Sequence, residues 1–73
     1  MRFDFDTEKS RSVKRKHGDS LKEAQDLFDQ MYLVDQRNDD PEQFRAIGSC
    51  RGRLCSVIFE IRHDAEGEYY RLL

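Results

Sequence analysis

The stretch Phe44–Ile61, FRAIGSCRGRLCSVIFEI, decides the fold. It contains two runs of alternating side-chain type, separated by Arg51-Gly52, a dipeptide that favours a tight turn. We therefore predict a β-hairpin. A two-residue loop at Arg51-Gly52 sets Ala46 opposite Val57 and Phe44 opposite Phe59, and residues opposite each other share one face of the sheet.

One face of the predicted hairpin is apolar. Its residues are Phe44, Ala46, Gly48, Cys55, Val57, Phe59 and Ile61. The other face mixes charged, small and aliphatic residues: Arg45, Ile47, Ser49, Leu54, Ser56, Ile58, Glu60 and Arg62. A four-residue loop Arg51–Leu54 would keep these faces, whereas a three-residue loop would turn one strand over. The sequence thus predicts the faces and leaves the register open.

Two helices are predicted before the hairpin. The first spans Thr7–His17, with Asp6 or Thr7 as its N-cap, a cationic last turn and Gly18 as its stop. The second spans Leu21–Gln30 and begins with the capping box Ser20-Leu-Lys-Glu23. Its apolar residues recur at helical spacing: Leu21, Ala24, Leu27, Phe28 and Met31. We expect this stripe to pack on the apolar hairpin face.

The remaining segments complete an α+β domain. Short strands are predicted at Arg2–Asp6 and Met31–Arg37, with an acidic loop Asn38–Glu42 before the hairpin. A turn over His63–Glu68 leads into a last strand, Tyr69–Leu73. The order β-α-α-β-β-β-β predicts a small antiparallel sheet with both helices on one face, and 73 residues form one domain, 1–73.

Composition limits the function classes. The net charge of −2 hides a segregation: residues 1–17 hold six Lys/Arg against three Asp/Glu, and residues 18–44 hold two against eight. The sequence contains neither an apolar run long enough to span a membrane nor a signal peptide, so we expect a cytoplasmic protein. It has no glycine-rich phosphate loop, nucleophile elbow or dinucleotide fingerprint, and we expect no cofactor.

The sequence offers no recognisable metal-ligand spacing, so no metal site is predicted. Cys50 and Cys55 lack a C-x-x-C pattern and histidine partners. We expect two small buried or half-buried thiols, and a disulfide between them only in the wider loop register.

Several motifs resemble one known family. They are Phe5-Asp6-x-Glu8-Lys9, Arg15-Lys16-His17-Gly18, Ser20-x-x-Glu23-Ala24 with Phe28, Ile47-Gly48 and Gly52-Arg53-Leu54. Together they resemble the BrnT toxins. The resemblance implies a RelE-like fold and the ribonuclease half of a type II toxin–antitoxin pair, neutralised by a ribbon-helix-helix antitoxin. Family members continue into a further segment and a charged helix, so a domain ending at Leu73 is expected to be C-terminally short and less active.

The candidate site residues follow from charge and from this resemblance. Metal-free RNA cleavage needs a base, cations for the phosphate and an acid. We assign the catalytic roles to His17, Arg62, Tyr70 and Arg71, since imidazole exchanges protons near neutral pH. RNA binding is assigned to closely grouped cations that neutralise phosphates: Lys14, Arg15, Lys16, Arg45 and Arg53. Plain cross-strand ion pairs, such as Arg45 with Glu60, are the structural alternative.

Three aliphatic residues on the polar hairpin face predict a partner. Ile47, Leu54 and Ile58 have no cover in the chain, so we expect an antitoxin or a second copy to bind there. The alternative function is a non-catalytic module on the same fold that binds only RNA or the antitoxin.

Overall fold

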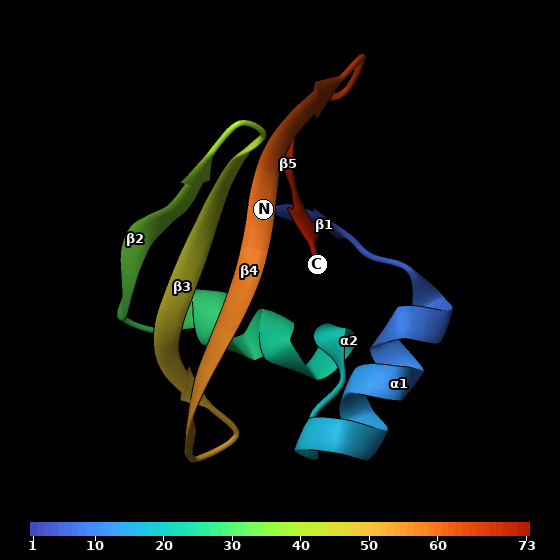
Figure 1. The fold of residues 1–73 in the computed structure, drawn as a ribbon, viewed down its shortest axis with the longest axis vertical. Coiled ribbons are helices and arrows are strands. Elements are labelled where there is room, and N and C mark those ends of the chain that lie inside the picture. Colours follow the sequence, from blue (N-terminus) through green and yellow to red (C-terminus); the bar gives the residue numbers. More distant parts are fainter.

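The computed structural model describes all residues, 1–73, as an α+β fold with a five-stranded sheet (Figure 1). The strands are β1 (Arg2–Asp4), β2 (Tyr32–Asp39), β3 (Glu42–Cys50), β4 (Arg53–Asp64) and β5 (Gly67–Leu72). The helical elements are α1 (Thr7–His17), α2 (Leu21–Ala24) and the 3-10 helix η1 (Gln25–Asp29). The sheet order is β1-β5-β4-β3-β2.

The predicted hairpin is β3–β4, with the two-residue loop. Phe44 lies opposite Phe59, Ala46 opposite Val57 and Cys50 opposite Arg53. Both loop residues have positive φ, 54° at Arg51 and 79° at Gly52, as a type I′ turn requires. The register that the sequence left open is therefore the tight one, and the two faces are those predicted.

The sheet is mixed, which corrects the prediction of an antiparallel sheet. β2–β3, β3–β4 and β4–β5 are antiparallel, but β1 pairs with β5 in parallel, with Phe3 opposite Tyr70. A parallel pair needs a long connection between its strands, and here the rest of the chain provides it. No local signal in a three-residue strand indicates the direction of its partner.

The ends of α1 match the predicted caps. The Asp6 carboxylate accepts hydrogen bonds from the backbone N–H groups of Glu8 (2.9 Å) and Lys9 (3.1 Å). At the other end Gly18 adopts φ 89° and its N–H donates to the carbonyl of Lys14 at 2.9 Å. Left-handed backbone is available to glycine without a Cβ penalty, so the helix ends there.

The second predicted helix is shorter than expected. The capping box between Ser20 and Glu23 is present, but the α-helix ends at Ala24 and continues as η1. Because Gln30 is extended (φ −122°, ψ 177°), Met31 lies beyond the last helical turn and is 95% exposed. Including Met31 in the apolar stripe was therefore wrong.

The core lies between the sheet and the α2–η1 segment, which crosses behind the lower half of β3 and β4 in Figure 1. Its buried hydrophobic residues are Leu21, Leu27, Ala46, Cys50, Val57, Phe59 and Leu72. Gly48 permits the close approach of η1 to the sheet, because a Cβ there would lie 3.4 Å from the Cγ of Leu27 and 3.0 Å from the Cβ of Tyr32 on β2. α1 packs mainly on α2. Ile61, predicted as core, is 38% exposed, since β4 extends past the helical layer.

A buried hydroxyl joins the two helices. Ser10 of α1 is 5% exposed, and its Oγ accepts hydrogen bonds from the N–H groups of Leu21 (3.0 Å) and Lys22 (3.4 Å). These are free donors at a helix start, so Ser10 acts as a second cap for α2. It thereby ties α1 to the start of α2.

Both cysteines are free thiols. Cys50 is buried, and burial raises the pKa of its thiol to about 11. No helix is both long enough and apolar enough to cross a membrane.

Candidate functional site

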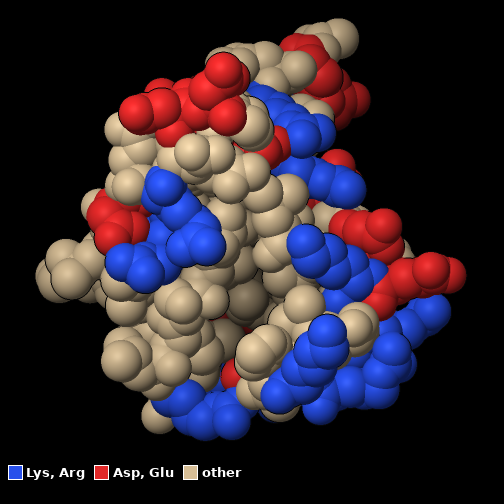
Figure 2. All heavy atoms as spheres, viewed as in Figure 1, with Lys and Arg blue, Asp and Glu red and all other residues tan.

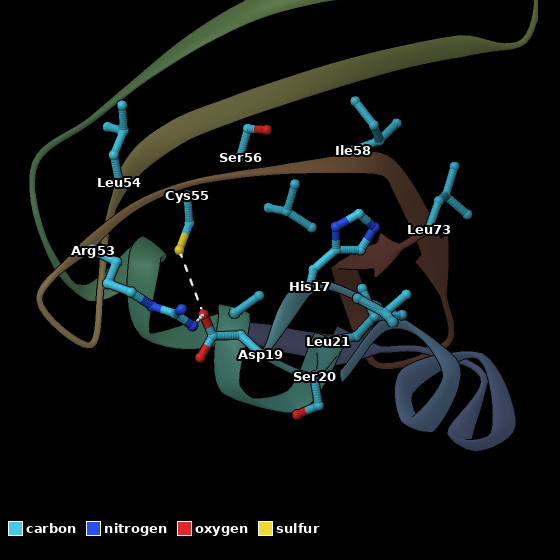
Figure 3. Close-up of a pocket in the computed structure, with 13 residues that line it drawn as sticks. His17, Asp19, Ser20, Leu21, Arg53, Leu54, Cys55, Ser56, Ile58 and Leu73 are labelled. Carbon is cyan, nitrogen blue, oxygen red and sulfur yellow. Dashed lines mark hydrogen bonds and ion pairs between the residues drawn. The ribbon is translucent and has the colours of Figure 1, made fainter. Parts of the chain in front are cut away.

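A groove of about 500 Å³ lies beside the first half of β4 (Figure 3). Residues 59–64 of β4 pair with β5, but the residues before them have only β3 as a neighbour. The Leu73 N–H makes the last contact along that edge, donating to the carbonyl of Ile58 at 2.9 Å. The end of α1, the start of α2 and β4 line the resulting groove.

Four predicted site residues line this groove: His17 and Arg53 from opposite sides, and the predicted partner-binding residues Leu54 and Ile58 along β4. His17, the last residue of α1, lies near Ile58 and Leu73, while Arg53 extends from β4 towards Asp19 (Figure 3). The Arg53 guanidinium forms an ion pair with the Asp19 carboxylate. An exposed imidazole and a guanidinium therefore share one concave surface, although they lie 36 residues apart in the sequence.

The cationic turn of α1 borders the groove. Arg15 and Lys16 are exposed and form no ion pair, and Lys and Arg gather around α1 at the lower right of Figure 2. Lys14 differs, because its Nζ lies 2.7 Å from a carboxylate oxygen of Glu23. Of the three cations predicted to bind RNA in this cluster, Arg15 and Lys16 therefore have no carboxylate partner and can bind a phosphate.

Glu23 connects α1, α2 and the hairpin turn. It accepts hydrogen bonds from Lys14, from Arg51 and from the backbone N–H of Ser20. The bonds from Lys14 and from Ser20, that of Lys14 first, hold the pKa of Glu23 at about 2. The capping box was visible in the sequence, but the two distant cations on the same carboxylate were not.

This network gives a testable dependence on pH. Because the pKa of Glu23 in the folded state lies below its ordinary value of 4.5, its stabilising contribution is complete above that value and is lost as pH falls towards about 2. Between those pH values the melting temperature of the wild type should fall more steeply than that of Glu23→Gln. Parallel curves from thermal unfolding by circular dichroism would show that the network contributes nothing.

The outer face of the sheet holds the other predicted arginines, each with a carboxylate partner. Arg45 binds Asp35 through two bonds of 3.2 and 2.6 Å. Arg62 pairs with Glu60, and Arg71 lies 2.7 Å from Asp4. The ion pair between Arg45 and Glu60 is absent, because Arg45 lies opposite Asp35 on β2 and Ile58 on β4.

Tyr70 lies on the opposite side of the sheet from Arg71. Its ring packs at centroid distances of 4.7 Å from Phe59, 5.5 Å from Phe28 and 6.0 Å from Phe3. Burial raises the pKa of its hydroxyl. The four predicted catalytic residues thus lie in three places: His17 in the groove, Tyr70 in the aromatic cluster, and Arg62 and Arg71 on the outer face.

The outer face also carries an apolar patch. Ile47 and Ile58 are half-buried and Leu54 is 83% exposed. Leu33 of β2, opposite Ile47, is 73% exposed and joins the patch. The sequence did not indicate Leu33, because the pairing of β2 with β3 was not predicted to the residue.

Comparison with known proteins agrees with this structure. The family model described as "Ribonuclease toxin, BrnT, of type II toxin-antitoxin system" matches residues 5–72, nearly the whole chain. A search of curated proteins finds no match. The matched region includes α1, the whole hairpin and every residue that lines the groove except Leu73. The chain therefore belongs to the BrnT family of ribonuclease toxins of type II toxin–antitoxin systems.

Proposed function

We propose that this chain cleaves RNA without a catalytic metal and that a ribbon-helix-helix antitoxin neutralises it in the cytoplasm. Its α+β fold, with helices preceding four consecutive antiparallel-connected strands, supports a RelE-like arrangement. The observation that carries the catalytic proposal is the groove that His17 and Arg53 both line, beside the free cations Arg15 and Lys16.

His17 is proposed as the general base. Neutral imidazole removes the proton from a ribose 2′-hydroxyl, whose oxygen then forms a bond to phosphorus. The bond from phosphorus to the 5′-oxygen breaks, leaving a 2′,3′-cyclic phosphate, and the leaving oxygen takes a proton from solvent. Arg53 neutralises the charge that develops on the phosphate oxygens. It can do so because its guanidinium is more than half exposed despite the pair with Asp19.

The remaining predicted residues have supporting roles in this proposal. Arg45, Arg62 and Arg71 would bind RNA only by exchanging a carboxylate partner for a phosphate. Tyr70 would act only if its hydroxyl reached the surface from the aromatic cluster. His17 and Arg53 are therefore the pair on which the catalytic proposal depends.

Those ion pairs favour a second candidate function, a non-catalytic module that binds RNA or the antitoxin. Arginines that already have carboxylate partners on the outer face stabilise the sheet without any substrate. In that case the groove would bind RNA without cleaving it.

The salt dependence of RNA binding tests the basic cluster. Each lysine or arginine that neutralises a phosphate of single-stranded RNA contributes about 0.7 to the slope of log K against log salt concentration. Replacing Arg15 and Lys16 together with alanine should flatten that slope by about 1.4. The matched control replaces the exposed cations Lys22 and Arg37, outside the groove, and should leave the slope unchanged. If the Arg15/Lys16 variant has the same slope as the control variant, the cluster is only a solvated helix end and does not bind RNA.

Expression of the chain in bacteria tests the toxin activity. The wild type should arrest growth and degrade cellular RNA, and co-expression of the small reading frame beside its gene should restore both. His17→Ala should permit growth at an equal level of folded protein. Normal growth with folded wild-type chain and intact RNA would support the non-catalytic module instead.

A further inference from the structure

Three side chains of types that can ligate metals converge at the tip of the hairpin. Asp19 comes from the loop between α1 and α2, Cys50 ends β3 and Cys55 lies on β4. One ligand atom from each lies within 4.8 Å of the other two. Cys50 is buried and the other two are half-buried, so the cluster is not a group of solvated surface acids.

The fold positions each of these groups on a defined element. Cys50 lies opposite Arg53 and Cys55 opposite Gly48, so the two thiols are diagonal neighbours on one face of a tight hairpin. Asp19 lies between two helix caps, Gly18 at the end of α1 and Ser20 at the start of α2. Its carboxylate already contacts Cys55, with 3.9 Å between Sγ and the oxygen (Figure 3).

The donor set matches one kind of cation. Zinc binds cysteine sulfur at about 2.3 Å and carboxylate oxygen at about 2.0–2.2 Å in tetrahedral geometry, which sets ligand atoms roughly 3.5–4 Å apart. The limit of 4.8 Å lies within reach of small side-chain rotations. Two thiolates disfavour magnesium and calcium, which prefer oxygen ligands. We propose that Asp19, Cys50 and Cys55 form a zinc-binding site that joins the hairpin tip to the α1–α2 loop.

The fourth coordination position opens towards the groove, since Asp19 and Cys55 both line it. A water molecule would complete the tetrahedron there. On binding, each thiol releases its proton to solvent and both sulfurs coordinate as thiolates.

The zinc has a structural role in this proposal and takes no part in RNA cleavage. The proposal is therefore independent of the ribonuclease activity. It predicts a site that connects two segments more than 30 residues apart, which explains why no ligand spacing was visible in the sequence.

Cobalt binding to the purified, reduced chain tests the site. Cobalt(II) in a tetrahedral thiolate site gives intense sulfur-to-cobalt charge-transfer and visible d–d absorption. We expect one equivalent to produce these bands and one equivalent of zinc to remove them. Zinc should also raise the melting temperature, because it binds only the folded state.

Variants of the proposed ligands distinguish binding at this site from adventitious binding elsewhere on the chain. Asp19→Asn and Cys55→Ser should each weaken zinc binding by more than about 100-fold, beyond the usual effect of losing an outer-shell partner. Asp29→Asn, an exposed acid on η1, is the matched control and should bind as the wild type does. Circular dichroism establishes that each variant is folded. Absence of the charge-transfer bands, affinity unchanged by Asp19→Asn, or thiols that form a disulfide in place of taking up metal would each overturn the proposal.

Discussion

Replacement of Phe59 by alanine is expected to remove most of the stability of this domain. The Phe59 side chain is 2% exposed, and its ring lies 4.7 Å from Tyr70, 5.4 Å from Phe28 and 5.6 Å from Phe44. Truncation of a buried phenylalanine costs about 3–5 kcal/mol. A chain of 73 residues has a total stability of roughly 4–11 kcal/mol. The variant should therefore be marginally folded.

Thermal or urea unfolding followed by circular dichroism measures this loss. In a domain of this size 1 kcal/mol shifts the melting temperature by about 4–8 °C, so Phe59→Ala should melt more than about 12 °C below the wild type. Leu54→Ala is the control, since Leu54 is 83% exposed and its truncation should change stability by less than about 0.5 kcal/mol. A Phe59→Ala protein that melts within a few degrees of the wild type would contradict the core described here.

Placing a charge in the outer apolar patch is expected to abolish binding of the antitoxin. Ile47, Leu54 and Ile58 belong to the outer sheet face, with Leu54 and Ile58 at the edge of the groove, and burying each is worth about 1.5–3 kcal/mol. Ile58→Asp both removes one such contribution and buries a carboxylate without a partner. The dissociation constant should rise by at least about 100-fold, since each factor of ten corresponds to about 1.4 kcal/mol.

Titration of the purified pair by calorimetry measures this effect. Leu54→Asp should act in the same direction with less influence on folding, because its side chain is almost fully exposed. Met31→Asp is the matched control, as Met31 is an apolar residue 95% exposed outside the patch. If both patch variants bind the antitoxin with unchanged affinity, the antitoxin binds a different surface. If Ile58→Asp unfolds the isolated chain, Ile58 belongs to the core, and the antitoxin is not needed to cover it.

The parts of the fold that were predicted from the sequence depend on local interactions. The caps at Asp6, Gly18 and Ser20 involve groups within four residues of each other, and the structure contains all three. The Arg51-Gly52 turn likewise indicated the hairpin and its two faces, although the tight register was left open by the sequence and is seen only in the structure, with positive φ at both loop positions. Such features can be predicted from the sequence because residues close together along the chain provide both the donor and the acceptor.

The parts that were not predicted depend on distant residues. Met31 continues the helical spacing, but the change to a 3-10 turn ends the helix before it. The parallel pairing of β1 depends on where β5 lies, and no feature of Arg2–Asp4 encodes that. The ion pair of Asp19 with Arg53 bridges 34 residues. The groove therefore became visible only when the helix ends and the hairpin were placed together.

The most direct test of the account is cleavage of a defined RNA by the purified chain in the presence of a metal chelator. If His17 is the general base, the products should carry 2′,3′-cyclic phosphate and 5′-hydroxyl ends. The account also predicts that His17→Ala lowers the rate by about 10²–10⁴-fold, the usual contribution of a general acid or base, while RNA binding persists. Folded wild-type chain that leaves the RNA intact, or cleavage that requires added metal or is unaffected by His17→Ala, would contradict it.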